Sequence, residues 1–270
     1  MANFGTLLII GATSGIGEEL GRQYHAQGKT VIISGRRTAR LDALTAELPG
    51  LGSIQIDVQD LHALPGKIDE AFTRYPNIDA VIVNAGIQKL LDYSNPDSTS
   101  NTYPATEAIT KEITTNLTGP TVLARSVIEH FRASRPDQPS LLAFVTSGLA
   151  LIPFPTFPVY CATKSALHHF AVILRNQLKD SPISIVEILP PYVETELDTA
   201  HVDELAERFG GKMPQGMPVK EYVKSVVRGL KVVDKDGKVQ KYVADGMPRA
   251  AVDAWAQAIG PIAQNVYTDL

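Results

Sequence analysis

The amino-acid sequence predicts an α/β fold, in which helices cover both faces of a doubly wound parallel sheet of about seven strands. Two observations point to it. Short apolar segments alternate with longer segments of helical periodicity, as in consecutive strand–helix–strand units. Most short segments are apolar almost throughout, which parallel strands require because both of their faces are buried. The predicted strands are 6–10, 30–34, 53–56, 79–83, 140–146, 183–189 and 239–244.

The predicted helices are 15–27, 38–47, 62–74, 105–133, 159–179, 202–209, 219–231 and 247–258. The 270 residues contain no internal repeat or linker, and this length fits a single domain over residues 1–270. Ligands of such sheets bind at the carboxyl ends of the strands. The residues that follow each strand are therefore the candidates for a functional site.

The first predicted strand leads directly into a glycine-rich turn. Gly11, Gly15 and Gly17 follow the apolar run 6–10, and a helical stretch continues from them to Gly28. Glycines in this context form a dinucleotide-binding fingerprint, because they permit a tight turn, close approach of the pyrophosphate and close helix-to-strand packing. The N–H groups at the start of the helix would bind the pyrophosphate.

The second predicted strand is followed by Arg36 and Arg37. A site specific for NAD places a carboxylate near this point to bind the adenosine ribose, but no Asp or Glu occurs between Glu19 and Asp42. A guanidinium binds the 2′-phosphate of NADP with two parallel hydrogen bonds. The loop therefore predicts NADP(H), with Arg36 as the primary contact because it is nearer the strand end. The other interpretation is that both arginines only cap a solvated turn.

Ser147, Tyr160 and Lys164 are the strongest candidates for catalytic residues. Ser147 follows the fifth predicted strand, and Tyr160 stands at the start of the helix 159–179. Lys164 lies one helical turn after Tyr160, on the same face. A nearby cation favours the phenolate and lowers the pKa of a tyrosine from its usual value of about 10. Such a phenol is a usable general acid or base.

These motifs, in this order, resemble those of the classical short-chain dehydrogenases/reductases, and the resemblance covers about residues 5–200. It implies a Rossmann-like fold that binds a nicotinamide dinucleotide. It also implies cofactor contacts at Gly11, Thr13, Ser14, Gly15, Ile16, Gly17, Arg36, Arg37, Asp57, Val58, Asn84, Ala85, Gly86, Tyr160, Lys164, Pro190, Val193 and Thr195.

The resemblance further implies a catalytic mechanism. Tyr160 would supply a proton to the substrate oxygen, and Ser147 would donate a second hydrogen bond to it. Lys164 would lower the pKa of the tyrosine and hold the nicotinamide ribose hydroxyls. Asn116 would hold a water that relays protons to Lys164. Three positions depart from the family pattern, where threonine, asparagine and glycine are replaced by Ile10, Val83 and Pro191.

The predicted function is an NADP(H)-dependent oxidoreductase of the carbonyl reductase type, which interconverts a carbonyl and an alcohol on a small, largely apolar substrate. A lid is predicted at 194–218, where two prolines and three glycines surround a short helix. The apolar stretch 149–159 is consistent with a substrate wall and with protein core. The alternative function is a non-catalytic dinucleotide-binding regulator on the same fold. Candidate substrate contacts are Ser147, Leu149, Phe154, Tyr160 and Tyr192.

Composition narrows the classes of partner. The formal net charge is −4 and there is no basic stripe, which argues against nucleic acid or an anionic membrane as a main partner. Cys161 is the only cysteine, so no intrachain disulfide forms, which suits a reducing compartment. Without a run of 18 apolar residues or a cleavable leader, the sequence predicts a cytoplasmic protein. No residues have metal-site spacing, and His168 and His169 are interpreted as packing or interface residues.

The helix predicted at 159–179 has more apolar surface than one buried stripe needs. In the family that the chain resembles, the helices matching 105–133 and 159–179 commonly pair between subunits. The resemblance therefore implies a homodimer or homotetramer. The apolar residues concerned are Ala162, Ala166, Leu167, Phe170, Ala171 and Leu174.

Overall fold

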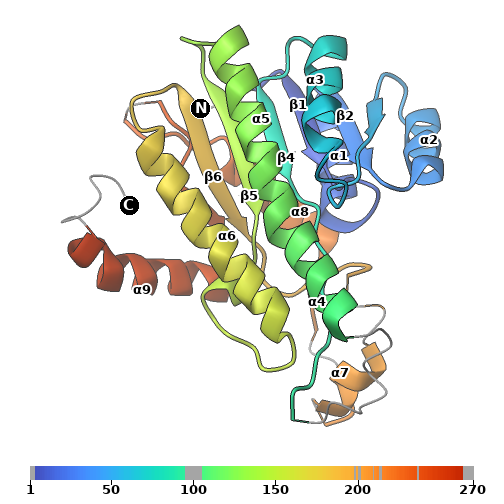
Figure 1. Ribbon diagram of the computed structural model, residues 1–270, viewed down its shortest axis with the longest axis vertical. Coiled ribbons are helices and arrows are strands. Elements are labelled where there is room, and N and C mark those ends of the chain that lie inside the picture. Colours follow the sequence, from blue (N-terminus) through green and yellow to red (C-terminus); the bar gives the residue numbers. More distant parts are fainter. Residues whose placement is uncertain are drawn as a thin grey trace.

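The computed structural model describes residues 4–94, 105–197, 199, 202–208, 210–212, 215–235 and 237–263. All seven predicted strands are present, and they form one sheet in which every neighbouring pair is parallel (Figure 1). The strands are β1 (Thr6–Ile10), β2 (Thr30–Gly35), β3 (Gly52–Gln55), β4 (Ala80–Val83), β5 (Ser140–Val145), β6 (Ile183–Leu189) and β9 (Tyr242–Ala244). Their order is β3-β2-β1-β4-β5-β6-β9, so the direction of winding reverses between β1 and β4, as in a doubly wound sheet.

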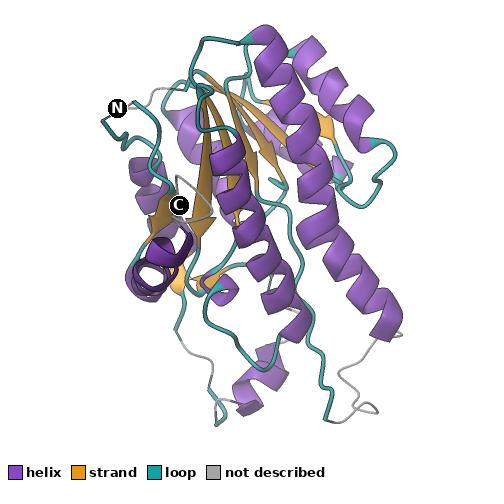
Figure 2. Cartoon of the chain, turned by 60° about the vertical axis from the view of Figure 1, so that its left-hand side comes forward, coloured by secondary structure: helices purple, strands orange, loops and turns teal. Residues whose placement is uncertain are grey.

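Helices cover both faces of this sheet, as Figures 1 and 2 show. Successive residues of a strand point to opposite faces: Leu8 and Ile10 belong to one hydrophobic core, and Leu7 and Ile9 to the other. The strands are apolar throughout because their side chains contribute to a hydrophobic core on each face of the sheet. The first core is covered by α3 (Leu64–Arg74), α5 (Gly119–Ser134) and α6 (Pro158–Gln177), and the second by α1 (Gly15–Ala26), α2 (Thr38–Glu47) and α8 (Val219–Gly229).

The helix predicted at 105–133 consists of three consecutive helical segments. After α4 (Ala105–Ile113) comes a π-helical turn over Thr114–Thr118, in which the N–H of Gly119 donates to the carbonyl of Thr114, and α5 then continues. Pro120 accounts for the interruption, because it lacks the N–H that would donate to the carbonyl four residues earlier. The turn carries Asn116, which is fully buried.

The segment predicted as a lid begins and ends in a short parallel ribbon, in which β7 (Val193–Glu194) pairs with β8 (Met217–Pro218). Between them in the chain lies α7 (Val202–Arg208). Parts of this segment lie outside the described residues. The last helix, α9 (Gly246–Ala263), continues past its predicted end. In the part of the chain that the structure describes, no helix is long and apolar enough to cross a membrane.

Candidate active site

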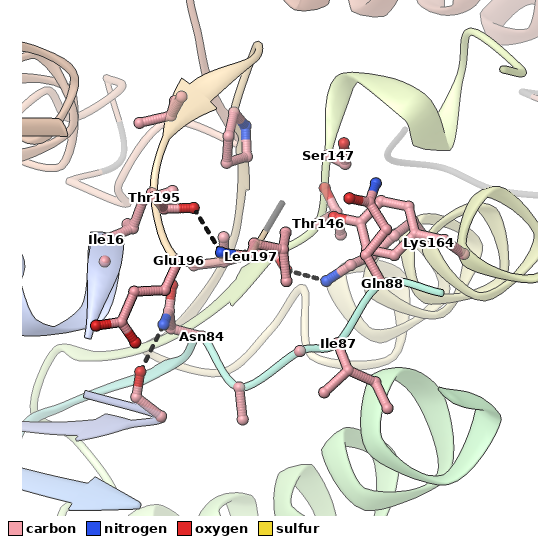
Figure 3. A pocket seen from close by; sticks show the side chains of 18 of the residues that line it. Ile16, Asn84, Ile87, Gln88, Thr146, Ser147, Lys164, Thr195, Glu196 and Leu197 are labelled. Atoms are coloured by element: carbon pink, nitrogen blue, oxygen red, sulfur yellow. Dashed lines mark hydrogen bonds between the residues drawn. The ribbon is translucent and has the colours of Figure 1, made fainter. Parts of the chain in front are cut away.

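Residues that follow β1, β2, β4, β5 and β6 line a cavity of about 660 Å³, part of which is shown in Figure 3. Most of the predicted site residues lie on its wall. Gly17, Asp57 and Asn116 do not. Those that do are Gly11, Thr13, Ser14, Gly15, Ile16, Arg36, Arg37, Val58, Asn84, Ala85, Gly86, Ser147, Leu149, Phe154, Tyr160, Lys164, Pro190, Tyr192, Val193 and Thr195.

The glycine-rich turn is compact because two of its glycines have no room for a side chain. Gly11 has a φ of 83°, and a Cβ there would lie 2.5 Å from the Cα of Ala85. A Cβ on Gly17 would collide with the carbonyl of Gly11 and lie 2.6 Å from Nδ2 of Asn84. That Nδ2 atom donates to the Gly11 carbonyl at 2.6 Å. The first residues of α1 thus line the cavity, and their N–H groups fit a pyrophosphate.

Arg36 and Arg37 both line the cavity, and Arg37 is anchored over the glycine-rich turn. Its guanidinium donates to Oγ1 of Thr13 at 3.0 and 2.9 Å and to Oγ of Ser14 at 2.7 Å. It also pairs with the carboxylate of Glu196 at 3.1 Å. The sequence favours Arg36 as the primary phosphate contact, but it is Arg37 that the structure positions beside the turn.

Val58 and Asp57, which follow β3, are placed differently. Val58 is buried on the cavity wall. Asp57 accepts a hydrogen bond from the N–H of Gln59 at 2.9 Å, within its own turn. The side chain of Asp57 therefore shapes the turn that presents Val58.

Ser147, Tyr160 and Lys164 line the same cavity. Ser147 ends the extension of β5, and its Oγ accepts from the N–H of Leu149 at 3.1 Å. Tyr160 lies in the first turn of α6, which Pro158 opens at a position that suits proline. Lys164 is 3% exposed; its Nζ donates to the carbonyl of Val145 at 2.8 Å and lies 5.5 Å from the centre of the Tyr160 ring.

The burial of Lys164 lowers its pKa to about 8, because the charged ammonium loses its hydration. Two buried carboxyl groups oppose this shift, Glu187 more strongly than Glu112. Glu112 lies in α4, where Oε1 accepts from the N–H of Lys89 at 2.9 Å and burial raises the pKa to about 7. The ammonium of Lys164 therefore carries its charge at neutral pH and loses it in mildly alkaline solution.

Asn116 connects the loop after β4 to α6. Its Oδ1 accepts from the N–H of Ile87 at 2.9 Å, and its Nδ2 donates to the Ile87 carbonyl at 2.8 Å and to Oγ1 of Thr163 at 3.2 Å. These contacts fix the backbone of the loop beside Lys164. The predicted role of Asn116 in holding a water stays a prediction.

A buried polar network behind the site was not predicted from the sequence. Glu187 of β6 accepts from Oγ1 of Thr146 at 2.7 Å and contacts Nδ1 of His168 at 2.8 Å. Arg175 lies 3.7 Å from the same carboxylate. Thr146 directly precedes Ser147, so the network supports the backbone at the end of β5. His168 is fully buried, in agreement with its interpretation as a packing residue.

The wall of the cavity around Ser147 is mainly apolar. Within the apolar stretch 149–159, Leu149 and Phe154 are half-buried and line the cavity, whereas Phe157 lines it and also packs in a small core with Leu205 of α7. The stretch therefore contributes both to the wall of the cavity and to the protein core. Glu196, Leu197 and Leu205 of the predicted lid segment also line the cavity. Other wall residues that the sequence did not indicate come from distant segments: Gln88, Lys89, Thr115, Met247 and Pro248.

Comparisons with known proteins agree with this geometry. The family model described as short chain dehydrogenase matches residues 5–206. An uncharacterized oxidoreductase of Bacillus subtilis, DltE, is 36% identical over 226 residues, which are 84% of each chain. The NADP-dependent 3-hydroxy acid dehydrogenase of Schizosaccharomyces pombe is 31% identical over 201 residues, 71% of this chain and 72% of that protein.

A solved structure, a short-chain dehydrogenase from Sphingobium yanoikuyae in complex with NADPH, has a TM-score of 0.73 and 25% identity, and the match covers 95% of each chain. The family model spans well over half of this chain, and the glycine-rich turn and the Ser147, Tyr160 and Lys164 side chains of the family pattern line one cavity. The chain belongs to the short-chain dehydrogenase family.

Proposed function

We propose that this oxidoreductase uses NADP(H) to interconvert a carbonyl and an alcohol on a small, largely apolar substrate. The observation that carries the proposal is the shared cavity: Tyr160, Ser147 and Lys164 face the same space as the glycine-rich turn. A nicotinamide dinucleotide bound at that turn would supply or accept the hydride. The turn fits such a group, because Gly11 and Gly17 let it pack closely against Ala85 and Asn84, and the first residues of α1 then line the cavity.

The residues of the chain then handle the charge that develops on the substrate oxygen. Hydride transfer to a carbonyl leaves negative charge on that oxygen, which needs a proton and hydrogen bonds. The Tyr160 hydroxyl supplies the proton, and the Ser147 hydroxyl donates a hydrogen bond. The ammonium of Lys164 stabilises the phenolate that remains on Tyr160. In the direction of alcohol oxidation, the same phenolate accepts the proton.

The cofactor and the substrate class are inferred from charge and polarity. Arg36 and Arg37 line the adenosine end of the cavity, and Arg37 is fixed there by Thr13 and Ser14. Two guanidinium groups at this position favour a 2′-phosphate. The apolar wall around Ser147 favours an uncharged carbonyl compound. No observation favours a non-catalytic regulator.

The proton donor is tested by replacing Tyr160 with Phe, which keeps the volume of the ring and removes the acid. Oxidation of NADPH with a panel of ketones and quinones should slow by about 10²–10⁴-fold, while the affinity for NADPH should hardly change. Tyr75→Phe, which removes a hydroxyl far from the cavity, is the control. Near-normal turnover by the Tyr160 variant would show that the mechanism is wrong.

The pH dependence of the reduction follows from the pKa of Lys164. Its ammonium is charged below about pH 8 and neutral above it, so the rate of reduction at saturating NADPH should be high near neutrality and fall as the pH rises through about 8. Glu112→Gln removes a carboxyl group that helps to keep Lys164 charged, so the decline should move to lower pH. A rate that stays constant from pH 6 to pH 10 would contradict the role given to Lys164.

The cofactor preference is tested by comparing kcat/KM for NADPH and NADH. One charge-assisted contact to the 2′-phosphate predicts a preference for NADPH of about ten- to a hundred-fold. Arg36→Ala and Arg37→Ala should each reduce this preference, mainly by raising the KM for NADPH. Equal efficiency with both cofactors in the native protein would refute the assignment.

We also propose that the protein is a homodimer or homotetramer that pairs through α5 and α6. On α6, Ala162 and Ile173 are exposed, Ile173 with 41% of its surface. Sedimentation at micromolar concentration should show a dimer or tetramer, and Ile173→Glu should weaken it. Ile259→Glu, at a similarly exposed residue of α9, is the matched control. A native monomer under these conditions would refute the proposal.

A further inference from the structure

The carboxylate of Glu196 bridges Arg37, which lines the adenosine end of the cavity, and Arg40 of α2. It lies 3.1 Å from Nη1 of Arg37 and 2.7 Å from Nη2 of Arg40. All three side chains are about half exposed. Arg37 lowers the pKa of Glu196, so the carboxylate is anionic at neutral pH. An anion of the protein itself therefore occupies these guanidinium groups.

Glu196 reaches this position from the start of the predicted lid, two residues after the end of β7. The neighbouring Thr195 lies against the glycine-rich turn, where its side chain would be 3.3 Å from a Cβ on Gly15. Figure 3 shows Glu196 beside Asn84 and Ile16 at one side of the cavity, while Ser147 and Lys164 lie at the other. Glu196 is thus at the cofactor side of the site and away from the catalytic residues.

Arg37 is also one of the two arginines to which the 2′-phosphate would bind under the proposed function. Arg37 is held by Oγ1 of Thr13 and Oγ of Ser14, so its guanidinium stays beside the glycine-rich turn whether or not Glu196 is present. A phosphate monoester carries nearly two negative charges and three acceptor oxygens, against one charge and two oxygens for a carboxylate. The phosphate is therefore the stronger ligand for a pair of arginines.

We propose that Glu196 is an internal competitor for the 2′-phosphate of NADP(H), and that Arg40 is a phosphate-binding residue together with Arg37. Binding of the phosphate displaces the carboxylate of Glu196 from the two arginines. NADH, which has a hydroxyl at this position, leaves the bridge intact. The inference rests on the proposed use of NADP(H), and it adds a residue that lowers the affinity for that cofactor.

The test measures dissociation constants of Glu196→Gln by calorimetry at low ionic strength, with NADPH, NADH and the fragments 2′-AMP and 5′-AMP. Each exposed ion pair is weak, so removal of the competitor should lower the dissociation constants of NADPH and 2′-AMP by about three- to ten-fold. The dissociation constants of NADH and 5′-AMP should stay within about two-fold of those of the native protein. Raising the salt concentration should reduce the difference. The control is Glu194→Gln, which removes the same charge from an exposed residue of the nearby strand β7. It should leave the affinities for all four ligands unchanged.

Arg40→Ala provides the second arm of the test. It should lower the affinity for NADPH and 2′-AMP by about three- to ten-fold and leave the affinity for NADH unchanged. Unchanged binding of 2′-AMP by both variants would overturn the inference, as would equal tightening of NADPH and NADH by Glu196→Gln. Failure of the proposed cofactor is recognised separately. Suppose that the native protein shows no preference for NADPH, but that Glu196→Gln still raises the affinity for 2′-AMP. This result would support the competition by Glu196 and refute the proposed cofactor.

Discussion

The burial of the Lys164 ammonium is the constraint on which the rest of the site depends. A charged group that loses its hydration needs hydrogen bonds and a compensating charge from the protein. Nζ of Lys164 donates a hydrogen bond to the carbonyl of Val145 at 2.8 Å. Glu187 provides the larger part of the compensating negative charge. This requirement holds α6 against the carboxyl end of β5. Because Tyr160 lies one turn earlier on the same helix, it is carried to the same end of the sheet.

The compensating charge imposes a second constraint, because Glu187 is itself fully buried. Its carboxylate is satisfied by Thr146, His168 and Arg175, and Arg175 also donates to the backbone of β6 and to the carbonyl of Lys241. One chain of polar contacts thus joins β5, β6, α6 and the start of β9 behind the catalytic residues. Buried ion pairs contribute little net stability, so the visible consequence of this network is the position that it gives the end of β5 beside the site.

Much of the fold and site could be predicted because it depends on local patterns. The apolar runs specified the strands, and the glycines and the Tyr160–Lys164 spacing specified the two halves of the cavity. Contacts between distant segments could not be predicted in this way. Nothing near Glu196 indicates that it meets Arg37 and Arg40, and nothing in β6 indicates which side chains surround Glu187. Pro120 was a local signal for the break between α4 and α5, but an apolar periodicity that continues across it predicts one helix.

The π-helical turn over Thr114–Thr118 has a consequence for how sequences of this kind can vary in length. A π turn holds one residue more than an α turn, so it acts as a one-residue insertion absorbed within a helix. Each residue of an α-helix advances the side chains by about 100° around the axis. Deletion of one residue here would rotate α4 by about that angle relative to α5. Glu112, which is now buried against the loop after β4, would turn away from it. The one extra residue of the π turn therefore sets how α4 is rotated about its axis. It thereby sets the position of Glu112, the second carboxyl group near Lys164.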